Sequence, residues 1–409
     1  MLSVDAHLAD CLAAIAPLPA REVELLDAVG CLLAEDVVSA IDMPRFDNSS
    51  MDGYAVRAAE LASAGPGSAV SLPVLGDIPA GHAGGLQLEL GTTLRIMTGA
   101  PLPAGADAVV PVEWTDGGTD RVVIERAPTL AQHVRRSGED VRAGQTVLKV
   151  GARLSPRHIA LLAAVGRDRV LVQPRPLVVV MPTGSELVPP GKTLGPGQIH
   201  DSNGYGLIAA VRELGAEAEH GGVIDDVPES VTRMLATAAQ RADLVITTGG
   251  VSAGAYDTVK EVLRELGTVT FDKVAMQPGM PQGFGTIGDP ATPIFTLPGN
   301  PVSALVSFEV FVRPALLRLA GESSVPRETR TATAAVGWRS PAGKRQFVRA
   351  RLERGDGDEV QVRPVGGQGS HLVADLAEAT CLVVIAEDVT EVSAGDQVPC
   401  LVLDQRGRW

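Results

Sequence analysis

The chain has 409 residues, of which 45% are hydrophobic and 21% are charged, so it is long enough for several globular domains. Its formal net charge of −14 at pH 7 argues against a nonspecific nucleic-acid surface, so we expect no nucleic-acid partner. No uncharged apolar run approaches the roughly 18 residues of a membrane-spanning helix, so we expect no membrane association either.

The cysteines and the N-terminus point to a cytoplasmic protein. None of the four cysteines belongs to a C-x-x-C pair, which is typical of buried thiols in a reducing compartment: Cys11, Cys31, Cys381 and Cys400. Asp5 and Asp10 stand where a signal peptide would carry Lys or Arg.

Helical segments flank a β-rich segment in the first half of the chain. The spacing of apolar residues predicts a helix over 3–15 with Ser3 as its cap, and a second helical run follows at about 21–29. A third helix is predicted over 153–165, since Ser155 can cap it and Pro156 suits its first position.

The residues between these helices are rich in Gly, Pro and short apolar runs, which is typical of β structure with long loops. We therefore predict a discontinuous helical linking domain, formed by 1–45 and 146–175, with a β-rich domain inserted at 46–145.

The second half alternates between strands and helices. The fully apolar run "PLVVVMP" and the second buried strand "DLVITT" alternate with amphipathic runs that end at Gly. This alternation predicts an α/β domain over 176–325 with a parallel sheet covered on both faces. Short alternating strands from 326 to 409 predict a small C-terminal β-barrel or sandwich.

Polar or Gly-rich corners follow the strands of the predicted α/β domain. Ligands of open α/β sheets bind beyond the carboxyl ends of the strands, and glycine lets the backbone approach a bound group closely. The corners are 183–186, 201–203, 249–252 and 298–301.

Three carboxylates at this edge, Glu186, Asp201 and Asp257, would suit a hard cation such as Mg²⁺. Either Asp201 or Ser202, and likewise Asp257, could instead cap a helix.

The stretch "LPGNPVSA" at 297–304 places a proline on each side of Gly-Asn, immediately before a predicted helix. Because proline fixes φ, we expect Pro298 and Pro301 to hold this corner rigid, with the amides of Val302 and Ser303 facing an anion. The alternative is a stiff loop with no ligand.

Several familiar motifs are absent or fail. "GFGTIG" at 283–288 matches the dinucleotide-binding pattern, but Pro290 and Pro293 follow it, so we expect a hairpin instead of a helix. The sequence contains neither a P-loop nor an H-E-x-x-H zinc motif.

The β-rich segment carries a second set of polar clusters, "FDNSSMDGYAV" at 46–56, "RIMTGAPLPAGADAVVPVE" at 95–113 and "RRSGEDV" at 135–141. Such clusters are usually solvated turns, and they would matter for function only if they faced one cleft.

Eight stretches in order resemble the molybdopterin molybdenumtransferases, the family of MoeA and the gephyrin E-domain. They are "FDNSSMDGYAV", "RIMTGAPLPAGADAVV", "GEDV", "PTGSELV", "DSNGYGL", "TTGGVSAG", "PGMP" and "LPGNPVSALVSFEV". The resemblance implies a doubly wound α/β domain like that of MoaB and Mog, beside the inserted β-rich, helical linking and C-terminal barrel-like domains.

The resemblance also implies a homodimer with an active site shared between subunits. Its reaction would convert adenylylated molybdopterin and molybdate to molybdenum cofactor and AMP, with Mg²⁺. The implied partners are a molybdopterin adenylyltransferase and proteins of molybdoenzyme maturation.

Site residues follow from the same motifs. The resemblance implies catalytic roles for Asp52, Thr98, Asp140 and Asp257, and metal binding by Glu186, Asp201 and Asp257. The residues expected to bind substrate are Arg135, Ser185, Ser202, Gly249, Gly250, Ser252, Lys260, Lys273, Pro298, Asn300, Pro301 and Ser303.

Two positions depart from the family pattern. Gln277 stands where many members have Lys, and Ser185 stands where the usual residue is Asp. A glutamine attracts an anion less than a lysine does, and Lys260 and Lys273 are close enough in sequence to compensate. These departures leave open a weakly active or tungstate-handling paralogue.

A molybdopterin adenylyltransferase and a non-enzymatic pterin-binding scaffold are two further functions to be weighed against molybdenum insertion.

Overall fold

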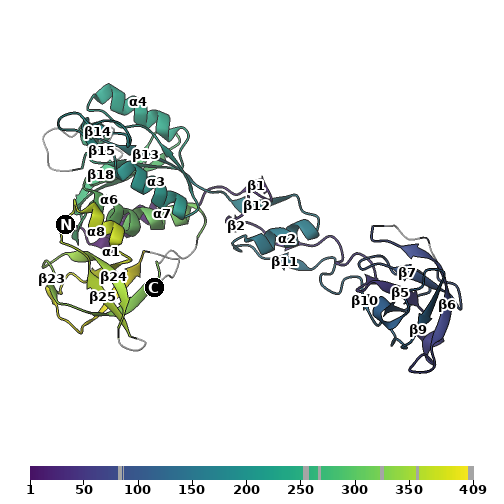
Figure 1. Cartoon of the computed structure of the whole chain (residues 1–409). Helices are drawn as coiled ribbons and strands as arrows, with labels where there is room; N and C mark the ends of the chain where they lie inside the picture. Colours follow the sequence, from purple (N-terminus) through teal and green to yellow (C-terminus); the bar gives the residue numbers. More distant parts are fainter. Residues whose placement is uncertain are drawn as a thin grey trace. The chain divides into compact units, whose positions relative to one another are not determined.

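The computed structural model describes residues 1–81, 85, 87–251, 258–265, 269–322, 327–355 and 359–403. It divides into two compact units (Figure 1). The first consists of Met1–Arg21 with Gln173–Trp409, and the second is Glu22–Val172.

A six-stranded sheet forms the centre of the first unit. Its strands, in sheet order, are β16 (Glu217–His220), β13 (Leu177–Pro182), β17 (Leu244–Thr248), β21 (Thr292–Leu297), β20 (Pro281–Ile287) and β18 (Val269–Lys273). The first four strands are parallel, whereas β20 and β18 are antiparallel to their neighbours. The hairpin expected at 283–288 is confirmed, because β20 and β21 pair directly.

Side chains of a strand point alternately to the two faces of the sheet. Both faces carry apolar side chains here, and helices cover both of them. Val178 and Val180 belong to one buried cluster, and Val179 and Met181 to another. The first cluster includes residues of α1 (Val4–Ala13), α3 (Asn203–Glu213), α6 (Pro301–Ser307), a π-helical turn (Phe308–Val312) and α7 (Arg313–Leu319). The second includes residues of α4 (Pro228–Ala239) and α5 (Thr258–Glu265).

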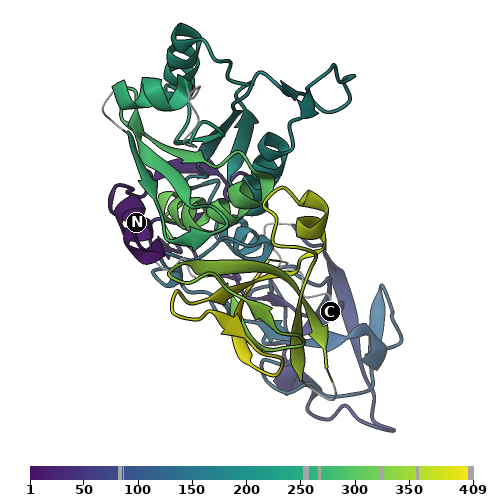
Figure 2. The same cartoon turned by 90° about the vertical axis from the view of Figure 1, so that its left-hand side faces the viewer.

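The C-terminal part of this unit is a β-barrel, as predicted. Each barrel strand pairs with two others: β24 (Arg345–Arg354), β25 (Val360–Pro364), β22 (Thr329–Ala334), β28 (Gln397–Val402) and β26 (Cys381–Ile385). The strand β19 (Met276–Gln277) joins β24 from the α/β part, and α8 (Val373–Glu378) follows β25. In Figure 2 the yellow-green barrel strands lie next to the α/β part of the same unit.

Short strand pairs complete the first unit. They are β14 (Leu187–Val188) with β15 (Ile199–His200), and β23 (Trp338–Arg339) with β27 (Glu391–Val392).

The second unit contains the predicted β-rich insertion. Its five-stranded sheet has the order β8 (Ala108–Pro111), β5 (Gly53–Val56), β7 (Thr93–Ile96), β6 (Val70–Ile78) and β9 (Arg121–Ile124). Two 3-10 turns, Ala58–Leu61 and Val112–Trp114, and the pair β4 (Asn48–Ser49) with β10 (Val134–Arg135) accompany it. Tyr54, Val56, Val110 and Ile124 form part of its core.

The rest of the second unit is more β-rich than the predicted helical linking domain. It contains the helix α2 (Pro156–Ala164), the sheet β1 (Arg21–Glu24)–β12 (Arg169–Gln173)–β2 (Leu32–Leu33), and the pair β3 (Val37–Val38)–β11 (Thr146–Leu148).

Two predicted helices of the N-terminal half are confirmed and one is wrong. Ser3 caps α1 by accepting from the amide of Ala6 at 3.1 Å. Ser155 directly precedes α2, which begins at Pro156, and its amide donates to Nδ1 of His158 at 3.2 Å. Residues 21–29 are not a helix, since β1 pairs with β12 there and turns follow.

The N-terminal helix also differs from its predicted assignment to the linking domain. The side chains of Val4 and Cys11 pack in the core of the α/β part, so α1 belongs to the first unit.

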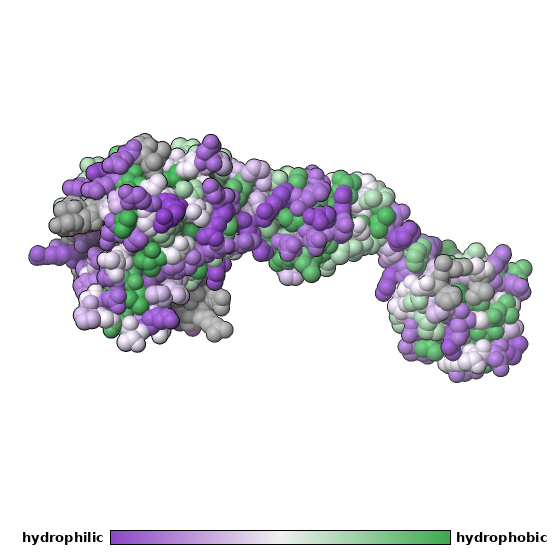
Figure 3. Space-filling view, turned by 90° about the horizontal axis from the view of Figure 1, so that it is seen from above, coloured by the Kyte–Doolittle hydropathy of each residue, from purple (hydrophilic) through white to green (hydrophobic). Residues whose placement is uncertain are grey.

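Hydrophilic residues cover much of the visible surface of each unit, in keeping with the charge of the chain (Figure 3). None of the described helices combines the length and the apolar character that crossing a bilayer requires.

Candidate active site

A cavity of about 830 Å³ opens beyond the carboxyl ends of β13, β17 and β21. All four corners predicted from the sequence contribute to its wall. The corner residues that line it are Thr183, Gly184, Glu186, Asp201, Ser202, Asn203, Gly249, Gly250, Pro298, Gly299, Asn300 and Pro301. Ser303, His371 and the strand pair β14–β15 also contribute.

Two of these corners touch each other. The amide of Gly249 donates to the carbonyl of Leu297 at 3.0 Å, which continues the β17–β21 ladder past the end of the strands. A Cβ on Gly299 would lie 3.4 Å from the Cα of Gly249, and Gly249 has φ +89°, a conformation that side chains disfavour. The glycines therefore let the two backbones meet at the cavity wall.

Asp201 is the most enclosed carboxylate of the wall, with 2% of its side chain exposed. Its Oδ1 accepts from the amide of Gly204 at 2.8 Å, and its Oδ2 lies 3.0 Å from Nε2 of His220. Asp201, and not Ser202, therefore caps α3, since Ser202 makes no side-chain capping bond.

Three described carboxylates line the cavity, Glu186, Asp201 and Asp226. Among the described residues, no three His, Cys, Asp or Glu side chains are clustered closely enough to hold a metal ion by themselves. Asp257, the third predicted metal ligand, lies outside the described residues, as does Ser252.

Asp226 was missed by the sequence reasoning. It follows β16, an edge strand with the sequence "EAEH" in which three of four residues are exposed. Such a strand has no apolar run, so the pattern used to find the other corners could not find this one. The "DDVP" stretch ahead of the α4 helix was the available signal.

The Pro-Gly-Asn-Pro corner lies in the cavity wall as expected, with Pro301 at the first position of α6. The expectation for Val302 is wrong, however, because its amide donates to the carbonyl of Ser370 at 3.0 Å. The side chain of Asn300 also donates to the Ser370 hydroxyl, at 2.8 Å. A loop of the barrel thus covers this end of α6 and places His371 in the cavity wall.

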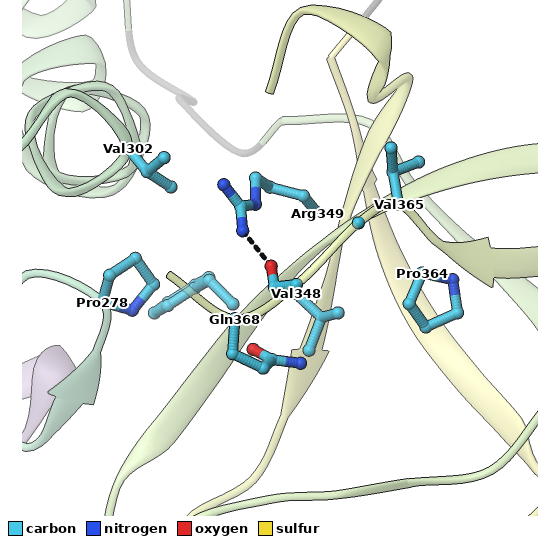
Figure 4. A pocket seen from close by; sticks show the side chains of 10 residues that line it. Pro278, Val302, Val348, Arg349, Pro364, Val365 and Gln368 are labelled. Atoms are coloured by element: carbon cyan, nitrogen blue, oxygen red, sulfur yellow. Dashed lines mark hydrogen bonds between the residues drawn. The ribbon is translucent and has the colours of Figure 1, made fainter. Parts of the chain in front are cut away.

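A second cavity lies between this corner and the barrel (Figure 4). Its volume of about 10 Å³ leaves room for about one water molecule. Pro278 and Val302 approach it from the α/β part, and Arg349 from the barrel. Arg349 donates to the carbonyl of Leu372 at 2.9 Å and to that of Gly367, and burial lowers the pKa of its guanidinium. Of these two cavities, the larger one has room for a substrate.

Some predicted residues lie elsewhere. Neither Ser185, Lys260 nor Lys273 contributes to the described wall of the large cavity. The ammonium group of Lys260 lies 5.6 Å from the ring centre of Phe271. Gln277 is part of β19, so it pairs with the barrel strand β24.

The predicted residues of the second unit include one close pair. Oδ1 of Asp52 accepts from the amide of Thr98 at 2.6 Å and from its hydroxyl at 2.8 Å, and these bonds lower the pKa of Asp52. Asp140 and Arg135 are exposed, and Arg135 pairs with Asn48 between β10 and β4.

Comparisons with known proteins cover nearly the whole chain. Residues 2–166 match the "MoeA N-terminal region (domain I and II)", 179–318 a "Probable molybdopterin binding domain", and 331–403 the "MoeA C-terminal region (domain IV)".

Two relatives from Mycobacterium tuberculosis illustrate the similarity. Molybdopterin molybdenumtransferase 2 is 50% identical over 382 residues, or 92% of this chain and 93% of that relative. Molybdopterin molybdenumtransferase 1 is 41% identical and covers 97% of each chain. Among solved structures, a molybdopterin biosynthesis MoeA protein from Pyrococcus horikosii has a TM-score of 0.79 at 34% identity, with 100% of both chains covered.

Proposed function

This chain belongs to the MoeA family of molybdopterin molybdenumtransferases, and we propose that the 830 Å³ cavity is where it inserts molybdenum into molybdopterin. The substrates are adenylylated molybdopterin and molybdate, and the products are molybdenum cofactor and AMP.

The make-up of the cavity wall carries this proposal. Its volume lies within the range of roughly 300–1,000 Å³ that is typical of small-molecule sites. Glycine corners at 249–250 and 299 let the backbone approach phosphate groups, and the start of α3 contributes a helix N-terminus.

The donor set of the wall fits Mg²⁺. Glu186, Asp201 and Asp226 offer carboxylate oxygens, the ligands that a hard cation prefers. Mg²⁺ usually binds through one or two protein carboxylates together with substrate phosphates and waters, so a complete protein cage is not required. We propose that Glu186 and Asp201 hold the ion, which when bound would neutralise charge on the substrate phosphates.

A homodimer with shared sites is the second part of the proposal. It is supported by the family resemblance and by the Asp52–Thr98 pair, which belongs to the unit that does not contain the cavity. A mixed dimer with Asp52→Ala in one chain and Asp201→Ala in the other should keep one intact site. Activity of the mixture no higher than that of either mutant homodimer would rule out sharing.

We propose a cytoplasmic location, with substrate supplied by a molybdopterin adenylyltransferase and product passed to proteins of molybdoenzyme maturation. All four cysteines are buried and none of them forms a disulfide, which suits a reducing compartment. In a two-enzyme assay, we expect adenylylated pterin to pass from the adenylyltransferase to this protein faster than the adenylyltransferase releases it into bulk solution.

The reaction can be tested with purified protein and adenylylated molybdopterin. AMP release should require both Mg²⁺ and molybdate, and Asp201→Ala should abolish it while the fold persists. Binding of the adenylylated pterin without any molybdate-dependent AMP release would instead favour a scaffold. Formation of the adenylylated pterin from ATP would favour an adenylyltransferase, and a response to tungstate alone would favour a tungstate-handling paralogue.

A further inference from the structure

His220 contacts Asp201 from the carboxyl end of the edge strand β16, where it pairs with Val180 of β13. Its Nε2 is 3.0 Å from Oδ2 of Asp201, and 30% of its side chain is exposed. The ring of Tyr205, one turn along α3, lies 5.8 Å away between ring centres. His220 is not part of the described cavity wall, so any effect on the site must pass through Asp201.

The backbone fixes which nitrogen of His220 carries the proton. The amide of Gly222 donates to Nδ1 at 3.0 Å, so Nδ1 is the acceptor nitrogen of a neutral imidazole. The proton therefore resides on Nε2, which donates it to Asp201. Gly222 has φ +93°, so the turn that brings its amide back to His220 favours glycine.

Asp201 is consequently hydrogen-bonded at both oxygens. The Gly204 amide binds Oδ1 and the His220 imidazole binds Oδ2, so the carboxylate cannot rotate without breaking one of these bonds. A carboxylate offers about four lone-pair sites in total, so sites remain for a ligand in the cavity. Hydrogen bonds to a metal-binding carboxylate typically set its orientation and its affinity for the ion.

We propose that His220 is a positioning residue for Asp201, and that it orients this carboxylate toward a divalent cation in the cavity. The inference rests on the proposed Mg²⁺ site. The competing interpretation is that His220 only fastens β16 to α3, in which case its loss would lower stability and leave cation binding unchanged.

The test measures binding of Mn²⁺, a spectroscopic substitute for Mg²⁺, by electron paramagnetic resonance in the presence of AMP, with the Mn²⁺–AMP complex subtracted. His220→Phe keeps a ring beside Tyr205 and removes the donor, so we expect about tenfold weaker Mn²⁺ binding. His220→Gln restores an N–H donor and should recover most of the affinity. Glu217→Phe places the same ring elsewhere on β16 and should bind as the wild type does. His220→Ala serves in place of His220→Phe if the latter does not fold.

Melting temperatures separate positioning from simple fastening. Lower stability of His220→Phe with wild-type Mn²⁺ affinity would overturn the inference while leaving the Mg²⁺ site in place. Equal losses in His220→Phe and His220→Gln would overturn it as well, because the donor would then not matter. Absence of protein-dependent Mn²⁺ binding in the wild type would overturn the Mg²⁺ site and the role of His220 together.

Discussion

The side-chain amide of Asn203 donates a 2.6 Å hydrogen bond to the carbonyl oxygen of Gly299. The bond joins the first residue of α3 to the Pro-Gly-Asn-Pro corner, 96 residues further along the chain. Two parts of the cavity wall are thus held at a set separation by one side chain.

Asn203→Ala should loosen this wall. Loss of the bond is expected to lower the free energy of unfolding by about 0.5–1.5 kcal/mol and to raise the KM for the adenylylated pterin. Urea unfolding and AMP-release kinetics measure the two effects. Ser202→Ala is the stability control, because Ser202 makes no capping bond and its loss should change stability by less than about 0.5 kcal/mol. An unchanged KM in Asn203→Ala would show that the corner keeps its place without the bond.

Two glycines of α3 should respond oppositely to alanine. A Cβ at Gly204 would lie 2.3 Å from Oδ2 of Asp201 and 2.7 Å from Cγ of Pro182, so Gly204→Ala must displace the carboxylate. We expect a loss of about 1–3 kcal/mol of stability and weaker Mg²⁺-dependent AMP release. At Gly206 the nearest atom would be a methyl carbon of Leu305 at 3.7 Å, an ordinary contact. Gly206→Ala should therefore raise stability by about 0.5–1 kcal/mol. Thermal unfolding of both variants gives the comparison, and equal effects would contradict it.

Replacing Pro298 and Pro301 together with alanine should lower stability by about 1–2 kcal/mol, because both prolines restrict the unfolded chain. A looser corner also has to be ordered when ligand binds, so we expect a higher molybdate concentration for half-maximal AMP release. The molybdate titration should be carried out well below the melting temperature of the variant. Pro293→Ala, within β21 and outside the described cavity wall, is the control for proline removal alone. If the molybdate curve does not move, the two prolines serve only the architecture.

Thr98 should control the ionisation of Asp52. Its amide and hydroxyl both donate to the carboxylate and lower the pKa of Asp52 below its ordinary value of 3.8. Thr98→Val removes the hydroxyl and keeps the amide, so the pKa of Asp52 should rise toward that value. Because the folded-state pKa is lowered, the stabilisation by these bonds is complete above pH 3.8 and is lost as the pH falls through the folded-state pKa.

Carbon-13 NMR titration of the Asp52 carboxyl measures this shift directly. Thr115→Val is the control, because the Thr115 hydroxyl donates to the carbonyl of Val112. This variant should leave the titration of Asp52 unchanged. A Thr98→Val titration that coincides with the wild type would mean that the amide alone sets the pKa.

Local patterns determined much of the fold. The strands β13, β17 and β21 contain no charged residue, which predicts burial on both faces, because a strand with one solvated face alternates apolar with polar residues. Ser3 marks a helix start for a reason contained in a few adjacent residues, namely its ability to bind a free amide. The four corners of the cavity follow from the same strands, because parallel strands end at one edge of a sheet.

Tertiary structure decided the features that depend on a partner distant in sequence. The amphipathic pattern of α1 shows that one face is buried, but not that its partner is the core around Phe311. β16 forms although its sequence is polar, because an edge strand needs pairing with β13 more than it needs burial. Ser370 occupies the amide of Val302 only because the barrel folds against α6.

Asp201 shows both contributions at one residue. The sequence by itself placed a carboxylate at the start of α3, where it could cap the helix or bind a metal. The fold brings His220 from β16 to its second oxygen, so that the cap is also a buried carboxylate held at both oxygens in a cavity wall. A hydrogen bond across 19 residues depends on how the strand and the helix pack, and short-range spacing does not encode that geometry.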